Sequence, residues 1–395
     1  MPPPTLPTEL VEYILDFLDS LRDRQTLSCS LVSRSWVQSS QSQLFREIRL
    51  RLSRQTRLSN EQIVSPHLVL YIRRLEILSH IRSRLNSNPL VAQLLPMLSA
   101  LCSLKLYNVN WGGSGGLSED VQQAFRALLA RPTLTSVHLD HCNSYRPLLP
   151  FYVLLSTVPS LKRLSLSQTR LDHENDVASD YPPPRKPVTL DYLSLERFVE
   201  SLISSRISQF IDFTRLRTLV SHDDVCHVYI IPLLPVLGRA GTLERLELDS
   251  VPQSPEFDLS LVPSLRHLSL KYVNAEEGGR LVGFLSNVSA LAQLEDVHIV
   301  IGAEILVIPD NRSPSIDWTA WGELDELFAA PPLIRLRRVT FDVDVSECWD
   351  LDLYYGVDTS LGPNEVARFE AMFSKLRQRG VLRVNEVNLT LSDCI

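Results

Sequence analysis

The sequence predicts an α/β solenoid, with a parallel sheet on its inner face and helices outside, preceded by a small all-helical module. Three observations predict this arrangement. A short apolar hexad recurs along residues 60–395, stretches of helical periodicity lie between its copies, and the first 50 residues show helical spacing without any hexad. We therefore expect a helical domain over residues 1–50 and a repeat domain over residues 51–395.

The hexad has the form L-x-x-L-x-L and is clearest at residues 101–106, 161–166, 243–248 and 265–270. Looser copies place apolar residues at the same spacing. The central apolar residues of all copies occupy positions 75, 104, 137, 164, 219, 246, 268, 297, 339 and 387. Several of the intervals fall in or just beyond the roughly 20–29 residues that one strand-and-helix repeat occupies.

Apolar residues of helical period fill the intervals, for example over 121–130, 230–237 and 366–376. Several of these stretches end in Pro or Gly just before the next hexad, which stops a helix and starts a new strand. The segment 190–195 also has hexad spacing, but it continues with helical spacing as far as Ile203. We therefore predict a helix there.

The hexad predicts which side chains are buried. Its first, fourth and sixth residues are apolar, so a strand buries them and turns the third and fifth residues outward. One strand and one helix cannot enclose a core, but stacked copies form a continuous parallel sheet. Because a helix is wider than a strand, the stack curves with the strands inside. From about residue 60 onward the chain resembles the leucine-rich-repeat superfamily, although the Asn or Cys that follows the hexad in that family recurs only irregularly.

Residues 5–50 read as helical and carry many large apolar side chains. A unit of this size buries a modest share of its apolar surface, so some of these side chains are expected to face another surface. The module resembles an F-box in the order and spacing of three patterns: Leu6-Pro7-x-Glu9-Leu10-x-x-x-Ile14-Leu15-x-x-Leu18, then Leu31-Val32-Ser33-Arg34-x-Trp36, then Leu44-Phe45-x-x-Ile48.

The F-box resemblance implies docking on the Skp-type adaptor of cullin–RING ubiquitin ligases. Carried over by position, the residues that contact the adaptor are Leu6, Pro7, Leu10, Ile14, Leu15, Leu18, Leu27, Val32 and Trp36. The alternative is that these side chains only hold the three helices together. For Trp36 both roles stay open.

The formal net charge of −7 is unevenly spread. Residues 1–100 hold 12 basic and 8 acidic side chains, and the remainder holds 27 and 38. Arginines between positions 46 and 57 could form a basic arm for nucleic acid. However, Ile48, Leu50 and Leu52 alternate with them, which favours the polar side of an amphipathic stretch. We expect no nucleic-acid partner.

The chain opens without the cationic and apolar regions of a secretory signal. No apolar stretch approaches the roughly 18–20 residues that a membrane helix needs. The six cysteines are scattered without a CxxC pair, as expected for free thiols in a reducing compartment. We therefore expect a cytoplasmic or nuclear protein with no membrane partner.

The sequence contains only weak indications of a metal site or a catalytic site. Segments 222–227 and 138–142 combine His and Cys, but zinc needs three or four converging ligands and at least one repeat separates the two segments, so we predict surface loops. The acidic run 342–352 could suggest the paired carboxylates of a carbohydrate enzyme; an inserted surface loop is favoured. No phosphate-loop, dinucleotide or G-x-S-x-G motif occurs, so we expect no enzyme activity and no cofactor.

The remaining candidate for function is the inner, concave face of the solenoid. Third and fifth hexad residues are expected to point there and to hold a protein segment through hydrogen bonds and charge pairs. These target-binding candidates are Lys105, His138, Arg163, Arg245, Glu247, His267, Asp296, His298 and Arg338. Each of them is also compatible with an ordinary solvated position on a sheet.

The function predicted from these patterns is that of a substrate-recognition adaptor in a Skp–cullin–F-box type ubiquitin ligase. Residues 5–50 would dock on the adaptor and through it on a cullin, and the repeats would hold a protein target that the sequence does not identify. One alternative is a leucine-rich-repeat scaffold or regulatory protein not linked to ubiquitination. Another is an enzyme that uses the acidic run or the His and Cys segments.

Overall fold

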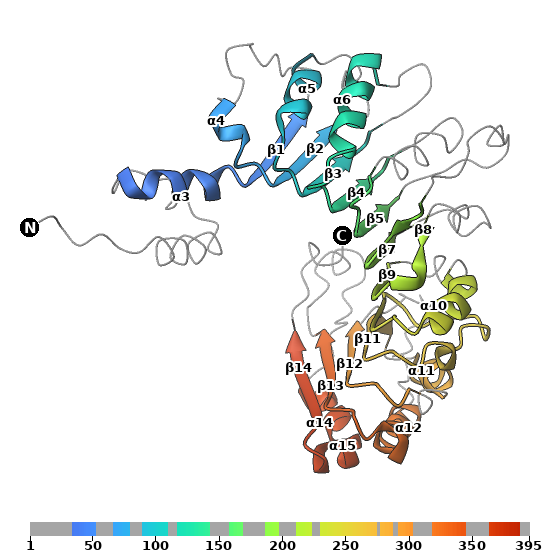
Figure 1. The fold of residues 1–395 in the computed structure, drawn as a ribbon. Coiled ribbons are helices and arrows are strands. Elements are labelled where there is room, and N and C mark those ends of the chain that lie inside the picture. Colours follow the sequence, from blue (N-terminus) through green and yellow to red (C-terminus); the bar gives the residue numbers. More distant parts are fainter. Residues whose placement is uncertain are drawn as a thin grey trace, which may run out of the picture. The chain divides into compact units, whose positions relative to one another are not determined.

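The computed structural model describes twelve stretches of the chain, which divide between two compact units. The described residues are 34–52, 66–79, 89–109, 117–142, 158–168, 186–196, 211–222, 230–274, 277–286, 291–302, 318–344 and 363–387. The first unit comprises Met1–Val188 with Gln209–Ile211, and the second comprises Thr189–Ser208 with Asp212–Ile395. Each unit is a stack of strands with helices along one side (Figure 1).

The first unit contains one parallel sheet in which each strand pairs with the next in chain order. Its strands are β1 (Glu47–Leu52), β2 (Arg74–Ser79), β3 (Ser103–Tyr107), β4 (Ser136–Asp140) and β5 (Arg163–Ser167). Its helices are α3 (Arg34–Leu44), α4 (Pro66–Val69), α5 (Pro89–Leu94), the short 3₁₀ helix η3 (Leu95–Met97) and α6 (Glu119–Leu129).

The second unit repeats the same arrangement with more strands, again all parallel. Its strands, in sheet order, are β7 (Tyr192–Glu196), β9 (Thr218–Ser221), β10 (Arg245–Leu248), β11 (His267–Asn274), β12 (Asp296–Gly302), β13 (Arg338–Asp344) and β14 (Leu382–Val387). Its helices are η6 (Phe213–Arg215), η7 (Ile231–Leu233), α10 (Leu234–Ala240), η8 (Leu259–Leu261), α11 (Gly278–Leu285), α12 (Trp318–Ala329), η11 (Pro331–Leu333), α14 (Pro363–Met372) and α15 (Ser374–Gln378). Two-residue strands, β6 (Val188–Thr189) and β8 (Ile211–Asp212), lie where the units divide.

The core forms as the hexads predict. In the hexad of the third strand, Leu101 just before β3 and Leu104 and Leu106 within it are fully buried. Helix α6 supplies the opposing apolar surface with residues such as Val121 and Phe125, which recur at the spacing of one helical face. The predicted parallel sheet with flanking helices, typical of leucine-rich repeats, is therefore confirmed for the described strands.

Strand register confirms most of the predicted hexad centres and corrects one. Positions 75, 104, 137 and 164 are aligned across β2–β5, and positions 219, 246, 268, 297 and 339 across β9–β13. In β14, however, Leu382 and not Val387 lies opposite Val339. The prediction for the last repeat was therefore five residues too late, because Val384, Val387 and Leu389 also have hexad spacing.

Two segments predicted to be helical are strands. Residues 192–196 form β7, with Leu193 opposite Leu219. The last four residues of the predicted helical module, 47–50, belong to β1, with Ile48 opposite Leu75. In both segments apolar and polar residues alternate, and pairing with a neighbouring strand favours this period of two over a short helical pattern. The predicted boundary at residue 50 therefore falls inside β1.

No helix in the described stretches is long and apolar enough to cross a membrane.

Candidate functional site

The face of each sheet opposite its helices, here called the open face, carries the polar residues of the strands. In the first unit the register aligns two rows of these residues across β1–β5. The first row is Glu47, Arg74, Ser103, Ser136 and Arg163, and the second is Arg49, Glu76, Lys105, His138 and Ser165. Because parallel strands lie about 4.8 Å apart, neighbours within a row are close enough to contact one another or a shared ligand.

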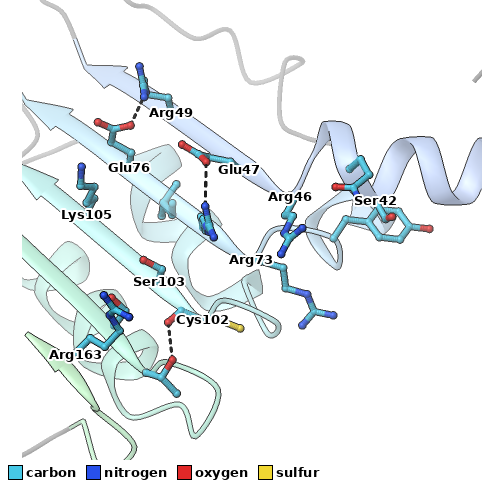
Figure 2. A pocket seen from close by; sticks show the side chains of 16 residues that line it. Ser42, Arg46, Glu47, Arg49, Arg73, Glu76, Cys102, Ser103, Lys105 and Arg163 are labelled. Atoms are coloured by element: carbon cyan, nitrogen blue, oxygen red, sulfur yellow. Dashed lines mark hydrogen bonds and ion pairs between the residues drawn. The ribbon is translucent and has the colours of Figure 1, made fainter. Parts of the chain in front are cut away.

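A hollow of about 900 Å³ lies at the amino-terminal ends of these strands, beside the end of α3 (Figure 2). We call it the basic hollow, because six of the residues that line it are basic and two are acidic. The basic residues are Arg46, Arg49, Arg73, Arg74, Lys105 and Arg163, and the acidic residues are Glu47 and Glu76. The polar side chains around them include Ser42, Ser103 and Thr135.

Both carboxylates of the basic hollow are paired with arginines. Arg49 contacts Glu76, whose side chain is only 10% exposed, and Arg74 Nη1 lies 3.8 Å from Glu47 Oε2. The other basic residues of the lining are Arg46, Arg73, Lys105 and Arg163. The two acidic side chains therefore leave the lining of the hollow with a net charge of +4.

Two basic side chains of the hollow have neutral partners among the described residues. The Arg73 guanidinium donates to the carbonyl of Ala100 at 3.2 Å. Lys105 Nζ donates to the hydroxyl of Tyr107 at 2.9 Å and lies 5.3 Å from the centre of its ring. Neither contact neutralises a full charge, so both cations keep most of their attraction for an anion.

The three sequence-predicted candidates of the first unit lie together. Lys105 and Arg163 line the basic hollow, and His138 is the register neighbour of Lys105 on β4. The ring of His138 lies 5.9 Å from the ring of Tyr107. Tyr107 and His138 thus lie next to Lys105, although neither lines the hollow itself.

The six candidates of the second unit also share an open face, and five of them contact another candidate. Asp296 Oδ1 accepts from Arg338 Nε at 3.1 Å, while its Oδ2 lies 2.9 Å from His267 Nδ1. Arg245 Nε donates to Glu247 Oε1 at 2.6 Å. The predicted candidates therefore form charge pairs, and most of their charge is already neutralised.

His298, the sixth candidate, pairs instead with a residue that was not among the candidates. His298 Nε2 lies 2.7 Å from Asp342 Oδ2, and Asn385 donates to Asp342 Oδ1 at 2.8 Å. Lys271 Nζ lies 3.6 Å from Glu247 Oε2. The polar–apolar alternation that continues past the hexad could have indicated Asp342 and Lys271, because each strand extends beyond the sixth hexad residue.

The predicted adaptor-binding residues lie mostly outside the described residues. This holds for Leu6, Pro7, Leu10, Ile14, Leu15, Leu18, Leu27 and Val32. The backbone of Trp36 belongs to α3. Their role in docking stays a prediction.

Comparison with known proteins gives structural likenesses alone. No model of a known protein family matches the chain, and no curated protein matches it. The structure is similar to that of human 5T4 (Wnt-activated inhibitory factor 1, trophoblast glycoprotein), at 16% identity and a TM-score of 0.31 over 86% of this chain and 85% of that one. It is also similar to a chain of the Drosophila Toll–Spätzle complex, at 12% identity and a TM-score of 0.25 over 91% of this chain and 45% of that one.

Of the two His and Cys segments, the structure describes residues 138–142, in and directly after β4, and His222, directly after β9. Within the described stretches no group of three or more His, Cys, Asp or Glu side chains is placed to hold a metal ion. His222 Nδ1 lies 3.0 Å from Asp249 Oδ2, and His141 Nδ1 lies 2.7 Å from Asp140 Oδ1. Cys142 is buried, and its thiol donates to backbone carbonyls of neighbouring strands.

Burial of Cys142 is expected to lower the reactivity of its thiol. Desolvation raises the pKa of its thiol from 9.0 to about 12. Because the thiolate is the reactive form, a pKa about three units higher lowers its fraction near pH 8 roughly a thousandfold. We expect iodoacetamide at pH 8 to leave Cys142 unmodified in the folded protein and to modify the partly exposed Cys102. Peptide-resolved mass spectrometry measures both, and equal rates of alkylation would contradict the buried thiol.

Proposed function

We propose that the chain is a non-catalytic substrate receptor of a Skp–cullin–F-box type ubiquitin ligase. The observation that carries the proposal is the order of two patterns along the chain. The F-box-like spacing of residues 6–48 runs directly into a stack of leucine-rich-repeat-like strands. A docking module followed by a binding surface is the organisation that such a receptor requires.

The connection between the two parts supports this proposal. Helix α3 contains the Arg34 and Trp36 positions of the F-box-like pattern, and only two residues separate the end of α3 from the start of β1. Both connecting residues are hydrogen-bonded to the last turn of α3, from Phe45 N to Gln41 O at 3.0 Å and from Arg46 N to Gln43 O at 3.2 Å. A short, bonded connection suits a receptor that must present its target at a defined place.

The open faces supply the receptor with its target-binding surfaces. They display rows of charged and hydrogen-bonding side chains on strands, which hold their positions better than loops do. In this proposal the chain performs no bond chemistry. It raises the effective concentration of the target near the transferring enzyme, and other subunits carry out ubiquitin transfer.

Adaptor binding tests the proposal. We expect the parent protein to recover the Skp-type adaptor in a pull-down, and the double variant Leu6→Ala/Pro7→Ala to recover at least tenfold less, because apolar contacts of a few kcal/mol are removed. Leu70→Ala is the matched control, since Leu70 is 57% exposed in the first unit. The control should recover the adaptor as the parent does.

The alternative of a scaffold without a ubiquitin role makes the opposite prediction. If the parent recovers no adaptor, or if the double variant recovers it undiminished, the F-box assignment fails. The open faces would then still serve a binding protein, since their charge pattern does not depend on the amino-terminal module.

A further inference from the structure

The basic hollow has a charge opposite to that of the whole chain. The chain carries a net charge of −7, whereas the lining of the hollow carries +4. Cations that gather in a recess create a local positive potential, which attracts and orients an anionic ligand. The overall composition of the protein therefore does not explain the positive charge of the hollow.

The second unit provides an internal comparison. On its open face, Arg245 and Lys271 contact Glu247, and Arg338 contacts Asp296. Those cations are paired within the protein. In the first unit, by contrast, the described partners of Arg73 and Lys105 are a carbonyl and a hydroxyl. Arg73 and Lys105 of the first unit are therefore the better candidates for pairing with an external anion.

We propose that the basic hollow binds an extended acidic segment of a protein partner, with carboxylate side chains on Arg73 and Lys105. The inference rests on the proposed function in one respect: the segment would belong to the target of the receptor. The row from Glu47 to Arg163 crosses four strand intervals. At about 4.8 Å each these span roughly 19 Å, the length of about six extended residues.

The carboxylates of the hollow favour a peptide over a nucleic acid. Glu47 and Glu76 lie among the arginines on β1 and β2 (Figure 2). A phosphate backbone carries a charge at every nucleotide and would meet these carboxylates along its length. A peptide can place its acidic residues on Arg73 and Lys105 and neutral residues beside the two glutamates. Such a mixed lining selects a spaced pattern of negative charge.

Fluorescence anisotropy on the full-length protein tests the ligand class. The probe is a labelled peptide of about ten residues in which Glu alternates with Ser, and the matched probe replaces each Glu by Gln. We expect the Glu peptide to bind at least tenfold more tightly, and its affinity to fall as NaCl rises, because salt screens exposed charges. Equal affinity of the two peptides overturns the proposal. Tighter binding of a single-stranded oligonucleotide of equal charge also overturns it, in favour of nucleic acid.

Charge reversal locates the binding site. We expect Arg73→Glu combined with Lys105→Glu to weaken binding of the Glu peptide at least tenfold. The control is Arg126→Glu, made on the exposed side of α6 in the same unit, and it should change affinity less than twofold. The milder pair Arg73→Gln with Lys105→Gln serves if the reversed variant does not fold, as judged by circular dichroism. Equal losses for the hollow variant and the α6 control would show that general attraction, and not the hollow, binds the peptide.

The two proposals fail separately. Peptide binding needs no adaptor, and adaptor recovery needs no charge in the hollow. If the hollow variants keep full adaptor recovery but lose the peptide, both proposals are supported. If the peptide binds at the hollow while the adaptor is never recovered, the acidic-segment site stands and the ubiquitin-ligase role fails.

Discussion

Replacing Gly238 by alanine is expected to lower the stability of the second unit by about 3 kcal/mol or more. Gly238 lies in α10 where this helix approaches η8 of the next repeat. A Cβ atom at this position would lie 1.7 Å from the carbonyl oxygen of Leu261 and 2.9 Å from its carbonyl carbon. Because these are backbone atoms, no side-chain rotation relieves the clash. The repeats would have to move apart, and the apolar contacts between them would weaken.

Gly283→Ala is the matched control for this prediction. Gly283 lies in α11 of the same unit, and no atom comes within 4 Å of a Cβ built there. Alanine is a better helix former than glycine by up to about 1 kcal/mol, so this variant should be as stable as the parent or more stable. Thermal melting compares the three proteins, and hydrogen exchange should show the loss at α10 and η8. Identical melting of the two variants would contradict the close approach.

The repeat fold could be predicted because each hexad buries three apolar residues on one side of a strand. In the hexad that contains β3, Leu101, Leu104 and Leu106 are fully buried. A helix would not separate these three residues from the polar Ser103 and Lys105 as well as a strand does. Repetition added a second constraint, since strands that pair in parallel must align their buried positions. Together these two requirements determined the strand positions of the middle repeats.

Prediction failed where short segments satisfied two periods at once. Ile48 and Leu193 have partners at both helical and strand spacing, and only pairing with β2 and β9 decides between them. At β14 the register follows the pairing with β13, which places Leu382 and not Val387 in the central position. Such decisions depend on neighbours that are distant in the chain, so a local pattern cannot make them.

The candidate site could be predicted in part for a related reason. Alternation indicated that Lys105 and Arg163 face the open side of the sheet, and the register confirms this. The basic hollow as a whole could not be predicted, because Arg46 and Arg73 lie just before strands and Arg49 lies on a strand that was assigned to a helix. Which carboxylate neutralises which cation also depends on side-chain directions across several strands.

Replacing Asp325 by alanine is expected to destabilise the carboxyl-terminal part of the second unit by about 2–4 kcal/mol. Asp325 lies in α12 and is only 4% exposed. Its two oxygens accept the backbone N–H groups of Lys375 and Leu376, each at 2.9 Å. These groups begin α15, whose own N-cap residue Phe373 provides no side-chain hydrogen bond. Alanine would leave two donors without an acceptor, and the one on Leu376 is in a buried bond.

Replacing the neighbouring Glu326 distinguishes the effect of losing a buried carboxylate from the effect of losing a negative charge. Glu326 also reaches α15, where it pairs with the side chain of Lys375, but it is 67% exposed. An exposed ion pair contributes at most about 1 kcal/mol, so Glu326→Ala should change the urea midpoint far less than Asp325→Ala. Asp325→Asn should fall between them, because its single carbonyl oxygen can replace only one of the two acceptors. Equal midpoints for Asp325→Ala and Glu326→Ala would mean that α15 is held by apolar packing alone. In that case Phe373 and Leu376, which are fully buried beside it, would be the residues to replace next.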